Sequence, residues 1–278
     1  MWRQSTFRIL IWLGQKLPVS WRVALTQSPA AAWLRQFTLL PLTQGQVVVA
    51  LSAPLAGYRM RLDMRAGHRR YALGTYEPEV FALIRSHLRE GQTVLDIGAN
   101  IGYFTLLMAH KVGPAGRVIA FEPVPSVYAM LCDNLRLNGC NWVQAECKAV
   151  GDVDGQGAMQ SDLNNPLSFI GHLCECGDLA VPIVSIDRYV ETAGLERLDF
   201  VKIDVEGAED RVIRGMMKTA KRLRPVILVE IHLNNSQESE GLRRLQKAGY
   251  RLMRVEPAGL SPCETLACRG HVLATWSQ

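Results

Sequence analysis

Short runs of hydrophobic residues alternate with segments of helical spacing along the last two thirds of the chain. Each run has the length of a buried strand, and the segments between them place apolar residues three and four positions apart. Strands that alternate with helices form a mostly parallel sheet covered on both faces, so the pattern predicts an α/β domain. The predicted strands are 94–97, 117–121, 142–150, 181–186, 198–203, 225–231, 250–255 and 271–275.

The first 73 residues follow a different pattern. Residues 1–40 are expected to form two helices, broken at Pro18 and near Pro29. Residues 46–51, 58–62 and 70–73 then resemble short strands. We therefore expect an N-terminal helical and short-strand extension over residues 1–73 and a second domain over residues 74–278.

One stretch combines a strand end, a glycine turn and a helix start. The run Val94 to Ile97 contains Asp96 and stops at Gly98, and helical spacing resumes from Gly102. Glycines in such a turn let a ligand approach the main chain closely. The dinucleotide version, G-x-G-x-x-G, binds a pyrophosphate, but here Asn100 replaces its middle glycine. A carboxylate beside the turn favours a ligand that carries an ammonium and a sulfonium, such as S-adenosylmethionine (SAM).

Acidic residues also stand at the ends of the later strands. Glu122 follows Gly98 by 24 positions and ends the next strand, where an acid hydrogen-bonds the hydroxyls of a ribose. Ligands of open α/β sheets bind outside the carboxyl ends of the strands, so these side chains are the candidate site. The remaining polar residues at strand ends are Asp152, Asp204, Glu206, Glu230 and His232.

The motifs resemble those of the FkbM family of SAM-dependent methyltransferases over roughly residues 74–276. They are Gly74-Thr-Tyr-Glu-Pro78, Asp96-Ile-Gly-Ala-Asn-Ile-Gly-Tyr-Phe104, Phe121-Glu-Pro123, Lys202-Ile-Asp-Val-Glu-Gly-Ala-Glu209 and Val229-Glu-Ile-His232. The resemblance implies a Rossmann-like class I methyltransferase fold, a seven-stranded sheet whose last strand is antiparallel. It also implies a cofactor site in which Asp96, Gly98, Asn100 and Gly102 surround the methionine part of SAM and Glu122 binds its ribose. Tyr76 and Glu77 are expected to close over the cofactor, and Asp152, Asp204 and Glu206 are placed with the cofactor-binding residues.

The expected reaction is O-methylation of a sugar, glycan or secondary metabolite. A hydroxyl is a poor nucleophile near neutral pH, so a general base would help. Asp204, Glu230 and His232 are the candidates, and His232 is preferred because its ordinary pKa lies nearest the operating pH. Lys202 is expected to pair with a neighbouring carboxylate. A divalent metal held by Asp204 and Glu230 is less favoured because no tight ligand spacing supports it, so no metal is predicted.

Composition narrows the partners. The chain has a net charge of +5, and its basic residues are scattered along the sequence. This pattern does not favour binding to nucleic acid. The seven cysteines indicate reduced thiols in a cytoplasmic protein, and Cys174 with Cys176 lacks the second pair that a zinc site needs. Residues 9–13, between basic residues, are expected to form a helix that caps the domain, with peripheral membrane contact as the alternative.

Several alternatives to O-methylation stay open. The acceptor is a small molecule, a glycan or a peptide, chosen by the polar loop 154–180, and a homodimer is one expected assembly. The methylated atom could be a peptide amide or amine nitrogen. A non-catalytic SAM-binding or nucleotide-binding protein is less favoured, because the strand-end acids are all present, and an NAD-dependent oxidoreductase is weaker again.

Overall fold

The computed structural model describes residues 13, 16–18, 21, 46–51, 55–63, 68–159, 173–174, 177, 179–232 and 238–277. Nearly all of residues 1–40, where two helices were predicted, residues 9–12 among them, and most of the predicted acceptor loop lie outside these residues. The chain divides into two compact units. The N-terminal unit comprises Met1–Pro78 and Arg136–Gly139, and the C-terminal unit comprises Glu79–Leu135 and Cys140–Gln278.

The N-terminal unit contains one two-stranded antiparallel sheet in its described part, formed by β1 (Gln46–Ala50) and β2 (Arg59–Asp63). Both strands were predicted. The third predicted strand, residues 70–73, is wrong, because this segment forms the helix α4 (Arg69–Leu73). Gly74 ends the helix in the left-handed conformation with φ of 63°, a common helix ending. Four residues are too few for a periodicity to separate strand from helix.

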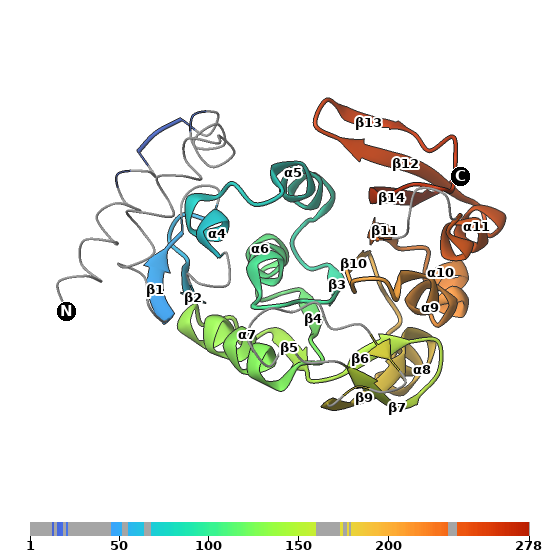
Figure 1. Ribbon diagram of the computed structural model, residues 1–278, viewed down its shortest axis with the longest axis horizontal. Helices are drawn as coiled ribbons and strands as arrows, with labels where there is room; N and C mark the ends of the chain where they lie inside the picture. Colours follow the sequence, from blue (N-terminus) through green and yellow to red (C-terminus); the bar gives the residue numbers. More distant parts are fainter. Residues whose placement is uncertain are drawn as a thin grey trace. The chain divides into compact units, whose positions relative to one another are not determined.

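The C-terminal unit is built on an eight-stranded sheet with the order β13-β12-β14-β11-β10-β3-β4-β5 (Figure 1). The strands β5, β4, β3, β10 and β11 are parallel, whereas β14 runs antiparallel to both β11 and β12. The predicted class I methyltransferase topology, with its last strand antiparallel, is confirmed. The strands are β3 (Thr93–Ile97), β4 (Arg117–Phe121), β5 (Val143–Glu146), β10 (Phe200–Ile203), β11 (Val226–Ile231), β12 (Tyr250–Glu256), β13 (Gly259–Pro262) and β14 (Gly270–Trp276).

The strands differ from the prediction in several details. Residues 155–159 and 173–174, inside the predicted polar loop 154–180, form strands. The short β13 was not predicted; it pairs with β12 at the edge of the sheet, and its exposed residues carry no hydrophobic signal. The predicted strand 142–150 is two strands, β5 and β6 (Ala149–Gly151). β6 belongs to a separate four-stranded sheet, in the order β6-β9-β7-β8, with β7 (Gly155–Met159), β8 (Leu173–Cys174) and β9 (Leu179–Ser185).

Helices cover both faces of the large sheet. Figure 1 shows α6 and α7 on one side and α9, α10 and α11 on the other. The helix α6 is buried almost all round, from Tyr103 to Val112, as expected of a helix enclosed in a core. The helices of this unit are α5 (Pro78–His87), α6 (Tyr103–Val112), α7 (Pro125–Leu137), α8 (Ile186–Thr192), α9 (Glu209–Arg214), α10 (Met217–Leu223) and α11 (Glu240–Lys247).

Candidate functional site

A buried lysine lies between two acids where β3 and β10 end. Lys202 stands opposite Asp96 in the parallel register. Its ammonium lies 3.9 Å from Asp96 Oδ1 and 3.1 Å from Asp204 Oδ2. It also lies 5.2 Å from the centre of the Phe104 ring. The expected pairing of Lys202 with a carboxylate is therefore confirmed, and one cation serves two acids.

The two acids differ in how firmly they hold their charge. Burial raises the pKa of Asp96, which is fully buried, although Lys202 and a 2.6 Å hydrogen bond from the Thr105 hydroxyl oppose the shift. Burial acts in the same direction on Asp204, but the nearby ammonium outweighs it and lowers the pKa of that carboxyl. Asp96 Oδ1 has no hydrogen-bond partner among the described residues. A buried oxygen of this kind is suited to a polar or cationic ligand group.

The structure gives a reason for the glycines of the turn that does not depend on a ligand. Gly98 has φ of 80°, and a Cβ atom there would lie 1.8 Å from the Asp204 carbonyl oxygen. Gly102 has φ of 92°, and its Cβ atom would lie 2.7 Å from Leu131 Cδ1. Backbone packing therefore requires glycine at position 98, whereas at position 102 the positive φ favours it. Asn100 also takes a positive φ of 50°, a conformation that asparagine tolerates better than most residues.

Glu122 joins the end of β4 to the same turn. Its two carboxylate oxygens accept hydrogen bonds from the backbone N–H groups of Asn100, at 3.0 Å, and Val124, at 2.9 Å. Burial raises the pKa of Glu122 to about 7, against these hydrogen bonds and with help from the charges of Asp96 and Asp204. The structure therefore brings Asp96, Glu122 and the glycine turn together, as the sequence predicted.

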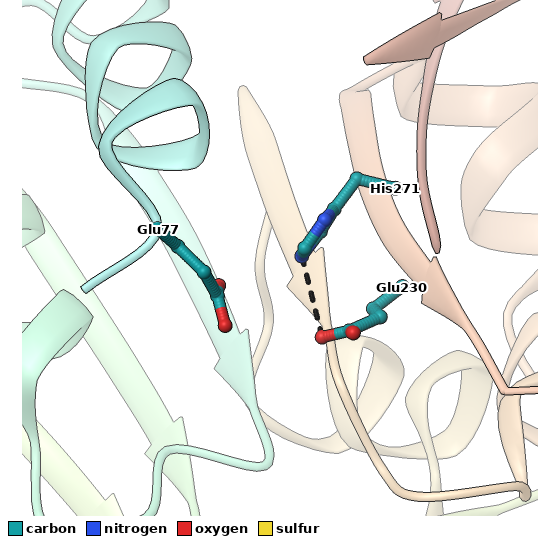
Figure 2. Close-up of side chains that lie close together, drawn as sticks. All are labelled: Glu77, Glu230 and His271. Atoms are coloured by element: carbon teal, nitrogen blue, oxygen red, sulfur yellow. Dashed lines mark ion pairs between the residues drawn. The ribbon is translucent and has the colours of Figure 1, made fainter. Parts of the chain in front are cut away.

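A second group of ionisable side chains lies at the ends of β10 and β11. His232 Nδ1 is 2.7 Å from Glu209 Oε1, and its Nε2 is 3.3 Å from Glu206 Oε2 and 3.6 Å from Glu230 Oε1. Figure 2 shows Glu230 and His271 directed toward one another from the neighbouring strands β11 and β14. Glu230 Oε2 and His271 Nε2 are 3.2 Å apart.

The carboxylates around His232 argue against its expected role as general base. The hydrogen bond with Glu209, opposed by burial and supported by the charges of Glu206 and Glu230, raises the pKa of His232 to about 9. The side chain is then an imidazolium near neutral pH, and an imidazolium has no nitrogen lone pair to accept a proton. With Glu206, Glu209 and Glu230 as its neighbours, His232 therefore carries a positive charge.

The other predicted cofactor residues are Asp152, Tyr76 and Glu77. Asp152 Oδ1 is 3.0 Å from the guanidinium of Arg211, and its Oδ2 is 2.8 Å from that of Arg214. This pairing with α9 accounts for both oxygens of the Asp152 carboxylate, and its cofactor role stays a prediction. Tyr76 and Glu77 belong to the N-terminal unit, where the Tyr76 ring lies 4.5 Å from the Tyr71 ring. Their closure over the cofactor stays a prediction.

The sequence did not single out three residues that the structure places in the site. Thr105 holds Asp96, Glu209 holds His232 and His271 holds Glu230. Thr105 lies nine positions after Asp96, where the first turn of the helix returns to the strand end. His271 could be found only by pairing β14 against β11, which brings it opposite Glu230.

Comparison with known proteins decides the family. The family model described as the methyltransferase FkbM domain matches residues 96–252, more than half of the chain. The chain belongs to the FkbM methyltransferase family. It is therefore a SAM-dependent methyltransferase, and the acid-lined glycine turn fits that cofactor. The Asp96 oxygen without a hydrogen-bond partner suits the cationic methionine end, and Glu122 suits the ribose.

The FkbM-family chain is similar to several named methyltransferases. It is 26% identical over 204 residues to the hexuronic acid methyltransferase AglP of Haloferax volcanii, covering 69% of this chain and 79% of the relative. It is 28% identical over 195 residues to the 31-O-demethyl-FK506 methyltransferase FkbM of Streptomyces tacrolimicus, covering 59% and 74%.

A solved structure, the methyltransferase FkbM of Methylobacillus flagellatus, is 16% identical with a TM-score of 0.44, covering 74% of this chain and 52% of that one. This score is too low to support a conclusion, so the fold assignment rests on the sheet order. Across the described segments, the structure contains no helix of the length and apolarity needed to cross a membrane.

Proposed function

We propose that this FkbM-family methyltransferase moves the methyl group of SAM to a hydroxyl of a sugar, glycan or secondary metabolite. The observation that supports this most is the set of partly exposed carboxylates beyond the cofactor turn. The side chains of Glu206 and Glu230 are 41% and 23% exposed and lie around one histidine. Carboxylates accept hydrogen bonds from hydroxyls, so they are suited to bind a polyhydroxylated acceptor.

The names of the relatives support the same acceptor class. One acts on a hexuronic acid and another on a demethylated oxygen of FK506. Both names describe acceptors that carry oxygen nucleophiles.

The residues divide into a cofactor part and an acceptor part. Asp96, Gly98, Asn100 and Gly102 would hold the methionine end of SAM, and Glu122 its ribose. When bound, SAM supplies an electrophilic methyl group. The remaining task of the protein is to place the acceptor oxygen in line with that group and to remove its proton.

In the acceptor part, Asp204 positions the acceptor and either Glu206 or Glu230 accepts its proton. Asp204 itself is a weak base because Lys202 lowers its pKa. Burial raises the pKa of Glu206, with the charge of His232 opposing, which makes Glu206 a stronger base than Asp204. His232, as a cation, keeps these carboxylates together. This division of roles replaces the expected one, in which His232 was the base.

The acceptor class can be tested with radiolabelled SAM. The full chain is incubated with tritium-labelled SAM and with two panels, one of uronic acids and other sugars and one of amines and peptide amides. We expect transfer to a sugar hydroxyl, with formation of S-adenosylhomocysteine and a product heavier by one methylene. Glu230→Gln should slow transfer without weakening SAM binding. Transfer to the amine panel alone would replace this proposal with N-methylation.

A further inference from the structure

We propose that Asp204, Glu230 and His232 bind a divalent transition-metal ion at the ends of β10 and β11. Each side chain offers one ligand atom, and these three atoms lie within 4.8 Å of one another. The residues are 28 positions apart at most in sequence but come from two strand ends, so no ligand spacing in the sequence reveals them.

Each of the three proposed ligands also contacts one side chain that is not a ligand. Glu209 contacts His232 Nδ1 at 2.7 Å, Lys202 contacts Asp204 Oδ2 at 3.1 Å, and His271 contacts Glu230 Oε2 at 3.2 Å. The remaining ligand atoms are the other oxygen of each carboxylate and His232 Nε2, which lies 3.3 Å from Glu206 Oε2 and would exchange its proton for the ion. Metal-binding histidines in proteins almost always have a carboxylate or carbonyl on the second ring nitrogen, and ligating carboxylates are held in the same way.

Glu209 gives this arrangement its rigidity. Its side chain is 1% exposed, and its Oε1 accepts a 2.8 Å hydrogen bond from the backbone N–H of Gly207 as well as contacting the histidine. Its Oε2 is buried and has no hydrogen-bond partner within the described part of the chain. A carboxylate buried in this way needs positive charge nearby, and an ion on the opposite nitrogen of His232 supplies it through the ring.

The distances suit an ion with short bonds. Two ligand atoms that are each ~2.1 Å from one metal lie roughly 3.0 to 3.5 Å apart at octahedral or tetrahedral angles. The separation of His232 Nε2 and Glu230 Oε1 is 3.6 Å, so small side-chain rotations admit an ion. An ion on Nε2 would replace the proton of the His232 imidazolium, so the surrounding carboxylates would still have a positively charged partner.

The donor set selects the class of metal. Imidazole with carboxylates suits zinc, manganese, iron or cobalt, whereas magnesium and calcium prefer sites made of oxygen alone. An ion here would act as a Lewis acid beside the acceptor and lower the pKa of its hydroxyl. Glu206 then remains as the proton acceptor. This catalytic role rests on the proposed function, but binding of the ion does not.

Metal binding is measured directly on the full chain. Protein treated with EDTA and dialysed is titrated by calorimetry with ZnCl₂ and with MnCl₂, and Mn²⁺ binding is followed separately by electron paramagnetic resonance. We expect one equivalent to bind with a micromolar or lower Kd. His232→Asn and Glu230→Gln should each weaken binding at least tenfold, and Glu209→Gln about tenfold through the histidine. His110→Asn, at an exposed histidine on α6, is the matched control and should bind as the wild type does.

Two results would overturn the proposal. One is the absence of saturable binding of either ion to the folded wild-type chain. The other is binding that His232→Asn and Glu230→Gln leave unchanged while circular dichroism shows them folded. If a variant does not fold, anomalous scattering at the zinc edge from crystals of the wild-type chain locates the ion instead. Because none of these measurements needs an acceptor, failure of metal binding and failure of hydroxyl methylation are distinguishable.

Discussion

Replacing Lys202 by Met should destabilise the protein by about 3 to 5 kcal/mol, the cost of removing one partner of a buried ion pair. Lys202 is 3% exposed and its ammonium is shared between Asp96, which is fully buried, and Asp204. Methionine has a similar length and keeps the apolar part of the side chain, so the loss reports mainly on the charge, including the cation–π contact with Phe104. Without the ammonium, Asp96 must take up a proton or remain an uncompensated buried anion.

The measurement is urea denaturation at pH 7.5, followed by far-UV circular dichroism. Lys148→Met is the control, because Lys148 also pairs with a carboxylate, Glu146 at 2.7 Å, but its side chain is 39% exposed. A pair of that kind contributes ~1 kcal/mol or less. Adding Asp96→Asn to Lys202→Met should restore part of the lost stability, since it removes the uncompensated acid. A loss below about 1 kcal/mol, or a double variant as unstable as the sum of the single ones, would contradict the reasoning.

Three further predictions concern the cofactor turn and its neighbours. Gly98→Ala should lower the melting temperature clearly and abolish SAM binding, because its Cβ atom would lie 1.8 Å from the Asp204 carbonyl oxygen; a fully stable variant would show that the turn can adjust. Burial raises the pKa of Glu122 from about 4.5 in the unfolded chain to about 7 in the folded chain. Its contribution to stability is therefore fully present below about pH 4.5 and is lost as the pH rises through about 7. Ribose hydroxyls favour the ionised form, so SAM affinity measured by calorimetry should increase over the same rise, and Glu122→Gln should remove that increase. Asp152→Asn should leave SAM affinity unchanged, since Arg211 and Arg214 account for the Asp152 carboxylate; weaker binding would support its cofactor role.

The part of the fold that the sequence could predict is the part fixed by strong hydrophobic patterning. Residues 94–97 and 225–231 are mostly apolar runs, each with a single acid, and both form buried parallel strands. The segment 70–73 and β13 are short or exposed, so hydrophobicity does not determine their structure. The division of 142–150 into two strands depends on which sheet each half joins, a long-range choice that no local pattern records.

The candidate site divides in the same way. Asp96 and Glu122 were found because a strand, a turn and a helix follow one another in the chain. Glu209 and His271 act on residues 23 and 41 positions away, and their role depends on strand order and register. The preference for His232 as base rests on the ordinary pKa of histidine, whereas the pKa in the folded chain depends on the carboxylates that the fold gathers around the ring.

Calorimetry with SAM, S-adenosylhomocysteine and NAD tests the central claim, that the acid-lined turn after β3 binds SAM, most directly. Wild-type protein and Glu122→Ala are titrated side by side at pH 7.5. The account predicts micromolar binding of SAM and of S-adenosylhomocysteine, with one site per chain, and no binding of NAD. Glu122→Ala should lower the affinity for SAM at least about tenfold, because hydrogen bonds to a charged group contribute about 1.5 to 3 kcal/mol each. Binding of NAD in place of SAM, or equal SAM affinity in a folded Glu122→Ala variant, would contradict it.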